Sequence, residues 1–131
     1  MLDREYEIMH RFENTHWWFV AKKNYIKTIL DLHFKDKGNN ILDIGCGTGG
    51  ITESLKDYGR VFGLDRHRAA CDFFCQRNRF PLIKGDANRL PFKKGTFHLS
   101  VLLVSCIINT SWMMRKFLSR SINYWFPTAL Y

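Results

Sequence analysis

Three aspartates and one cluster of glycines are the residues of this sequence whose types and spacing indicate binding chemistry. Asp43 stands shortly before the cluster Gly45-Cys46-Gly47-Thr48-Gly49-Gly50, and Asp65 and Asp86 follow at intervals of roughly 20 residues. Glycines after a strand allow a tight turn and let a ligand approach bare backbone. Carboxylates attract cations and accept hydrogen bonds from hydroxyl groups. Together these residues predict a crevice that binds a small molecule.

Three kinds of glycine-rich loop have to be distinguished for such a cluster. A phosphate-binding loop of the GxxxxGK[ST] type is excluded because no lysine follows these glycines. A dinucleotide fingerprint, GxGxxG, is satisfied by Gly45, Gly47 and Gly50, but a carboxylate at Asp43 would repel a pyrophosphate. S-adenosylmethionine (SAM) carries an ammonium and a sulfonium, which Asp43 would attract. Asp65 can bind the ribose of either cofactor, so an NAD(P)-binding oxidoreductase remains the alternative.

Short apolar runs alternate with helical patterns along the chain and must position these residues. Apolar and β-branched runs predict strands over residues 41–44, 60–65, 80–84 and 97–104. Apolar positions at three- and four-residue spacings predict helices over residues 1–33, 51–58 and 67–77. This alternation is typical of an α/β fold with a parallel sheet, whose carboxyl edge would gather the three aspartates.

Four segments resemble the motifs of the class I SAM-dependent methyltransferases. Residues 41–49 resemble the glycine-rich motif I, and residues 61–65 resemble the second-strand motif. Residues 85–92 and 95–98 are similar to the third and fourth motifs of the type 11 subgroup, except that His98 stands where the family commonly has aspartate. With the segment His16-Trp17-Trp18-Phe19, which resembles an N-terminal helix of some members, the resemblance covers about residues 14–104.

The resemblance implies a fold, a cofactor and a set of binding residues. The fold would be a Rossmann-like three-layer sandwich with a mostly parallel sheet, and the reaction would move a methyl group from SAM to a small-molecule acceptor. Asp43 would hold the amino group of the methionine part, Asp65 the ribose, and Asp86 with Ala87 the adenine. The remaining cofactor-binding positions that we predict are Gly45, Cys46, Gly47, Thr48, Gly49 and Arg66. No catalytic residue is assigned.

Composition limits the other functions. A chain of 131 residues fits one domain, which we divide into an N-terminal helical segment (1–40), a SAM-binding core (41–104) and a basic, aromatic tail (105–131). The net charge of +8 comes mostly from the region after Asp86, which has six basic residues and no acid, so nucleic-acid binding is disfavoured. No apolar run predicts a membrane span, and no signal core or disulfide framework is evident. We expect a cytoplasmic protein.

The tail departs from the family pattern after Val104. The expected acidic helix is absent, so we interpret the chain as a C-terminally truncated member whose sheet is incomplete after the fourth strand. A non-catalytic remnant that at most binds SAM is the alternative to an active enzyme. The aromatic tail would cap the sheet edge or promote self-association. A frameshift would explain the unusual tail, since the codons of Trp112-Met113-Met114 encode aspartates in another frame. Sequencing the gene tests this hypothesis.

Several other residues invite a functional interpretation, and we favour structural roles for all of them. His67, Cys71 and Cys75 share one helical face but lack a fourth zinc ligand, so no metal site is predicted. The small size of Cys46 explains its place in the glycine loop. Trp17 and Trp18 are interpreted as packing residues, and His98 as a histidine with a structural hydrogen bond.

Overall fold

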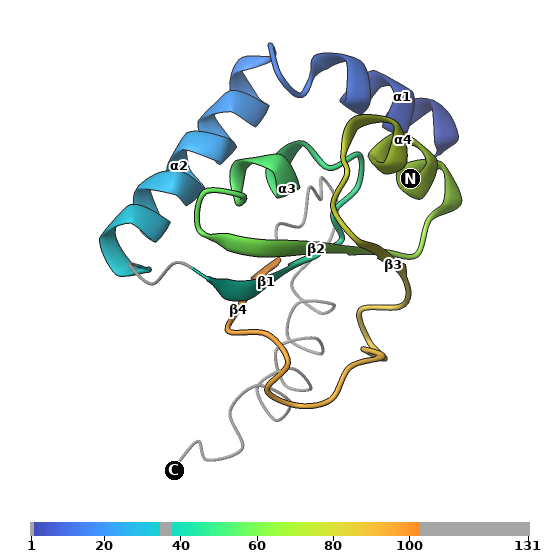
Figure 1. Cartoon of the computed structure of the whole chain (residues 1–131). Coiled ribbons are helices and arrows are strands. Elements are labelled where there is room, and N and C mark those ends of the chain that lie inside the picture. The colour runs from blue at the N-terminus through green and yellow to red at the C-terminus, as the bar shows by residue number, and fades with distance from the viewer. Residues whose placement is uncertain (1, 35–37, 103–131) are drawn as a thin grey trace.

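The computed structural model describes residues 2–34 and 38–102. Four parallel strands form one sheet in the order β3-β2-β1-β4 (Figure 1). Their bounds are Asn39–Ile44 for β1, Gly59–Asp65 for β2, Leu82–Lys84 for β3 and Leu99–Leu102 for β4. The predicted parallel α/β fold is confirmed, and β3 begins later than expected because Pro81 has no N–H for the sheet.

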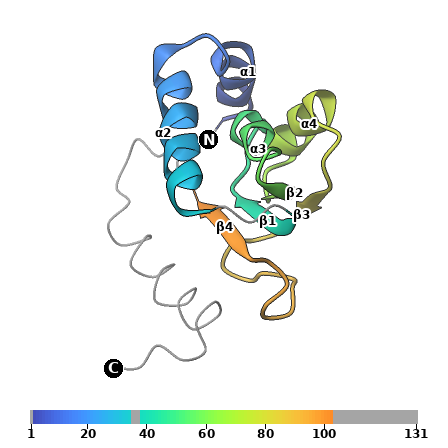
Figure 2. The same ribbon diagram turned by 60° about the vertical axis from the view of Figure 1, so that its left-hand side comes forward.

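Helices cover one face of this sheet. They are α1 (Asp3–Phe12), α2 (Trp17–His33), α3 (Gly50–Ser54) and α4 (Arg68–Arg77). Figures 1 and 2 show all four on the same side, with α1 lying against α4. Within the described ranges, the opposite face is covered by the connection from β3 to β4 and by no helix.

Two apolar clusters fill the space on either side of the sheet. On the helix side, Ile26 and Leu30 of α2 pack with Ile41, Leu55 and Val61. On the other side the cluster consists of alternate residues of the strands and of the β3–β4 connection, namely Leu42, Ile44, Leu64 and Phe97, with Phe92 and Leu90 against them. Strands buried on both faces explain the continuous apolar runs of the sequence.

The N-terminal segment forms two helices, where the sequence pattern predicted one continuous helical stretch. The break lies at residues 13–16, where Glu13 turns inward, with 4% of the residue exposed. His16 starts α2, because its Nδ1 accepts a hydrogen bond from the backbone N–H of Trp18 at 3.3 Å. The chain therefore changes direction between α1 and α2, so that both helices reach the glycine loop.

Some predictions concern residues outside the described ranges. The end of the fourth predicted strand and the whole tail of residues 105–131 belong to them, and with the tail the edge-capping and self-association hypotheses. Among the helices of the described residues, none combines the length and the apolar character that a membrane crossing requires. The predicted helix over residues 51–58 is shorter than expected, since α3 ends at Ser54 and a series of turns leads into β2.

Candidate functional site

The three aspartates lie at the carboxyl ends of three neighbouring strands. Asp43 is the next-to-last residue of β1, Asp65 is the last residue of β2, and Asp86 follows β3. The Gly85 N–H donates to the Asp65 carbonyl oxygen at 3.0 Å, so the chain after β3 stays beside β2. The parallel topology thus brings together the residues that the sequence analysis placed in one crevice.

The glycine loop is fastened to the end of β2. The backbone N–H groups of Gly45 and Cys46 both donate to the Leu64 carbonyl oxygen, at 2.7 and 3.1 Å. Gly45, Gly47 and Gly49 have φ angles of 70°, 55° and 84°, which lie in the left-handed region that favours glycine. Alternating left-handed residues produce the sharp return from β1 into α3.

Asp65 joins the glycine loop to the start of α4. Its Oδ2 accepts the Gly47 N–H and its Oδ1 accepts the His67 N–H, both at 2.9 Å. The side chain is largely buried, with 9% of the residue exposed. Asp65 therefore sets the position of the loop as well as presenting a carboxylate at the edge of the sheet.

Asp43 is an almost completely buried carboxylate at the base of the site. It is 2% exposed, and the Thr52 hydroxyl donates to its Oδ2 at 2.5 Å. Burial raises the pKa of Asp43 to about 7, against the lowering effect of the Thr52 hydrogen bond, and the nearby charge of Asp65 raises it further. A carboxyl group with this pKa changes its charge near neutral pH.

The raised pKa of Asp43 predicts an unusual dependence of stability on pH. The folded state holds this proton up to about pH 7, whereas the unfolded chain releases it near its ordinary value of 3.8, so stability falls as pH rises between these values. Replacing Asp43→Asn removes the effect. We expect urea unfolding to give the wild type and the Asp43→Asn variant equal free energies of unfolding near pH 4. At pH 8 the variant should be the more stable of the two. A variant that is less stable at pH 8 would contradict this prediction.

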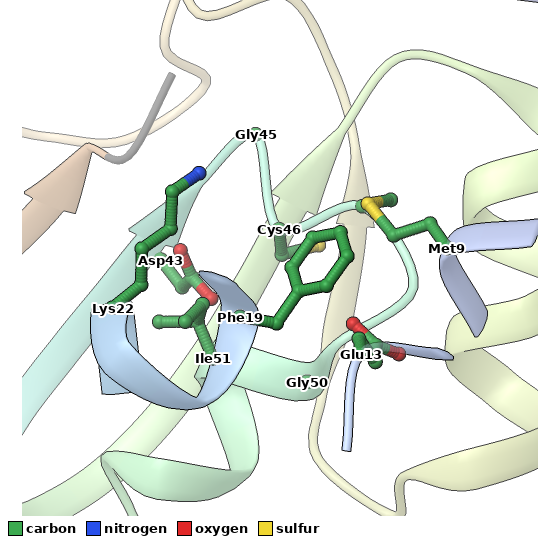
Figure 3. Close-up of a pocket in the computed structure, with 10 residues that line it drawn as sticks. Met9, Glu13, Phe19, Lys22, Asp43, Gly45, Cys46, Gly50 and Ile51 are labelled. Carbon is green, nitrogen blue, oxygen red and sulfur yellow. The ribbon is translucent and has the colours of Figure 1, made fainter. Parts of the chain in front are cut away.

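The two N-terminal helices cover the glycine loop and enclose a pocket beside Asp43 (Figure 3). A Cβ added at Gly47 would lie 3.0 Å from the Met9 methyl group, which shows how closely α1 approaches. The lining residues come from α1 and the residue after it, α2, β1, the glycine loop and the start of α3; they are Met9, Glu13, Phe19, Lys22, Asp43, Gly45, Cys46, Gly47, Gly50 and Ile51. Cys46 is buried, and burial raises the pKa of its thiol, so it is not a nucleophile at neutral pH.

Glu13, in the turn between α1 and α2, fixes the N-terminal helices to the glycine loop. Its Oε1 accepts a hydrogen bond from the Thr48 hydroxyl at 2.6 Å and forms an ion pair with Arg77 of α4. Arg77 also donates to the carbonyl oxygen of His10 at 2.7 Å. Thr48, a predicted cofactor-binding residue, is 0% exposed, so its hydroxyl serves the Glu13 contact in this structure.

Asp86 lies at the more open side of the same edge. The N–H and the side-chain amide of Asn88 donate to its Oδ1 at 2.8 and 2.9 Å, and these hydrogen bonds lower the pKa of Asp86. The positive charge of exposed Arg66 contributes to the same lowering. Ala87 packs against the apolar cluster beneath the sheet.

Four residues to which we gave structural roles do not line the pocket. His98 binds the amino end of β1, opposite to the aspartates, because its Nδ1 accepts the Asn40 N–H at 3.0 Å; this confirms the structural interpretation. The packing interpretation of Trp17 and Trp18 is wrong, since they are 70% and 50% exposed. The His67 ring lies against Tyr6, with centroids 4.7 Å apart.

Sequence reasoning missed the residues that α1 and α2 bring to the site. Met9 and Glu13 are four positions apart, and Phe19 and Lys22 are three apart, so helical spacing alone places each pair on one face. A glutamate and a lysine, however, indicate a solvent-facing side when no partner is known. Thr52 was also missed, although it lies one helical turn past Thr48 on the helix that follows the glycine loop.

The parallel sheet, with the glycine loop and the three aspartates at its carboxyl edge, defines a Rossmann-like domain. A family described as methyltransferase domain matches residues 41–123, and this chain belongs to that family. The match continues past Val104, where the motif resemblance ends. The resemblance to class I SAM-dependent methyltransferases is thereby confirmed.

Individual relatives agree with this assignment. The 18S rRNA (guanine-N(7))-methyltransferase of Bos taurus is 37% identical over 82 residues, which cover 59% of this chain and 29% of that protein. A structure from Methanococcus maripaludis assigned as a SAM-dependent methyltransferase has a TM-score of 0.68 at 17% identity, over 87% of this chain and 56% of that one. Magnesium protoporphyrin IX methyltransferase from Synechocystis, with bound SAM, has a TM-score of 0.63 at 16% identity, over 82% of this chain and 56% of that one.

The shared fold extends over only part of the related proteins. The chain spans 28 to 31% of the length of three curated relatives it matches and about half of the two structures, where the covered share is 56%. The similarity to the structures, at 16 and 17% identity, concerns the fold.

Proposed function

We propose that this chain is the cofactor-binding part of a SAM-dependent methyltransferase. The observation that carries the proposal is the buried Asp43 carboxylate, which lines a pocket between the glycine loop and α2. Asp65 ends the neighbouring strand β2, and Asp86 follows β3, the next strand of the sheet. An anionic crevice of this kind suits a cationic cofactor better than a pyrophosphate.

The residues of the crevice fit the parts of SAM. Gly45 is exposed, and a Cβ added there would meet nothing within 4 Å, so a ligand can reach its backbone. Asp43 would bind the ammonium of the methionine part, Asp65 the ribose hydroxyls, and Asp86 with the Ala87 backbone the adenine. Arg66, beside Asp86, would border the adenosine. SAM, when bound, supplies a methyl group activated by a sulfonium, and the protein contributes position and orientation.

We propose a small molecule as the methyl acceptor. Magnesium protoporphyrin IX methyltransferase is named for an acceptor of this kind, and geranyl diphosphate C-methyltransferase from Streptomyces coelicolor, a neighbour with a TM-score of 0.60, is another. The three described cysteines are free thiols, which accords with a reducing cytoplasm.

Binding of S-adenosylhomocysteine tests the proposal directly. A ligand at 100 times its dissociation constant adds about 2.7 kcal/mol to the free energy of unfolding, so we expect the melting temperature to rise by about 10 °C. Replacing Asp65→Asn should abolish most of this rise, because the ribose and the Gly47 N–H lose a charged acceptor.

Asp72→Asn is the matched control for the Asp65 variant. Asp72 lies on the exposed side of α4, where its carboxylate is 3.8 Å from the Arg68 guanidinium, and the variant should respond to S-adenosylhomocysteine like the wild type. A melting temperature raised by NADH and unchanged by S-adenosylhomocysteine would refute the methyltransferase assignment of the site and support the oxidoreductase alternative.

A further inference from the structure

Lys22 is a half-buried cation in the pocket, and within the described part of the chain it has no anionic partner. It lies on α2 and lines the pocket together with Asp43 and Gly45. The ion pairs of residues 2–34 and 38–102 do not include it, whereas Lys27 pairs with Asp57 and Lys56 with Glu53. Its Nζ lies over the rings of Trp18 and Phe19, 5.0 and 6.0 Å from their centroids.

The surroundings of Lys22 favour the approach of an anion. Burial lowers the pKa of its ammonium, which shows that the group has lost part of its hydration. A cation in this condition gains from a negatively charged ligand that replaces the lost water. The Trp18 and Phe19 rings hold the ammonium in place, and among residues 2–34 and 38–102 it donates no hydrogen bond.

Once Asp43 is ionised, which a bound ammonium favours, the pocket offers one charge of each sign to a ligand. Glu13 also lines it, but Arg77 and the Thr48 hydroxyl already satisfy that carboxylate. Asp43 and Lys22 remain, and Figure 3 shows the Lys22 side chain extending past Asp43 in the direction of Gly45. An α-amino acid group, with its ammonium and carboxylate, matches such a pair of charges.

We propose that Lys22 binds the carboxylate of the methionine part of the cofactor while Asp43 binds its ammonium. This inference rests on the proposed function and adds to it a residue that selects ligands carrying an intact amino acid group. Lys22 is a positioning residue, because it holds the end of the cofactor that is remote from the transferred methyl group.

A pair of ligands separates this role from general packing. S-adenosylhomocysteine carries the amino acid group, whereas 5′-methylthioadenosine has the same nucleoside and sulfur without it. We expect calorimetric titration of Lys22→Met to show affinity for S-adenosylhomocysteine reduced about 10- to 100-fold, the effect of losing a charged hydrogen bond. Affinity for 5′-methylthioadenosine should stay within about twofold of the wild type, since that ligand has no carboxylate for Lys22.

Lys23→Met is the matched control. Lys23 is the next residue of α2 and is also half-buried, but its Nζ donates to Asn14 Oδ1 at 2.6 Å and it does not line the pocket. The Lys23→Met variant should bind S-adenosylhomocysteine and 5′-methylthioadenosine with the affinities of the wild type. Equal losses for both ligands in Lys22→Met, or no loss for either, would overturn the inference. A wild-type chain that binds neither ligand would refute the proposed function itself.

Discussion

Replacing Glu13→Ala should lower the free energy of unfolding by about 3–5 kcal/mol, the usual effect of removing one partner from a buried ion pair. The variant leaves the Arg77 guanidinium, whose side chain is 13% exposed, without its counter-ion. It also removes the acceptor of the Thr48 hydroxyl, which is completely buried. Domains of this size are stable by only about 5–15 kcal/mol, so the loss is a large fraction of the total.

Urea unfolding of two further variants tests the explanation. Glu53→Ala removes a carboxylate from an exposed pair, in which Lys56 Nζ is 3.8 Å away, and should cost less than about 1 kcal/mol. In the double variant Glu13→Ala, Arg77→Met no unpaired charge remains, so part of the stability should return. If Glu13→Ala were as stable as Glu53→Ala, the ion pair would not hold the N-terminal helices to the loop.

The second large effect is expected for Gly49→Ala. Gly49 has a φ of 84°, and a Cβ at this position would collide with Asn78 Nδ2 and lie 2.7 Å from Cδ2 of Phe74, a ring with 0% exposure. The left-handed backbone costs roughly 1–2 kcal/mol for alanine, and overpacking adds about 1–3 kcal/mol. We therefore expect thermal or urea unfolding to show a loss of about 2–5 kcal/mol.

Gly95→Ala isolates the backbone contribution. Gly95 has a φ of 78°, close to that of Gly49, but nothing lies within 4 Å of an added Cβ. This variant should lose only about 1 kcal/mol, because strain is present without crowding. Equal stabilities of the two variants would mean that α4 moves aside freely and that the loop is not packed as tightly as the structure indicates.

The sheet and its binding edge could be predicted from the sequence because local patterns determine both. Ile41, Leu42 and Ile44 form a short apolar run before a glycine cluster, which is sufficient to place a buried strand and a turn. Once the strands are parallel, the order of the chain brings Asp43 and Asp65 to the same edge without any information about side-chain packing.

The covering of the site could not be predicted because it depends on contacts between distant parts of the chain. Glu13 is buried only because Arg77 and Thr48 reach it, and neither partner can be identified from helical spacing. The packing interpretation of the two tryptophans failed for the same reason. Trp17 and Trp18 follow the apolar pattern of a packed helix, yet Ile26 and Leu30 are the residues of α2 that face the sheet.

The Glu13–Arg77 pair also determines when the site can be completed during protein synthesis. The two residues are separated by 64 positions, and ribosomes add about 5–20 residues per second, so Arg77 is made roughly 3–13 s after Glu13. During this interval the carboxylate has no cation to pair with, and burying it alone would be costly. Although α1 and α2 leave the ribosome before α4, they therefore reach their final positions only after α4 has emerged, and the pocket that they line forms at that stage.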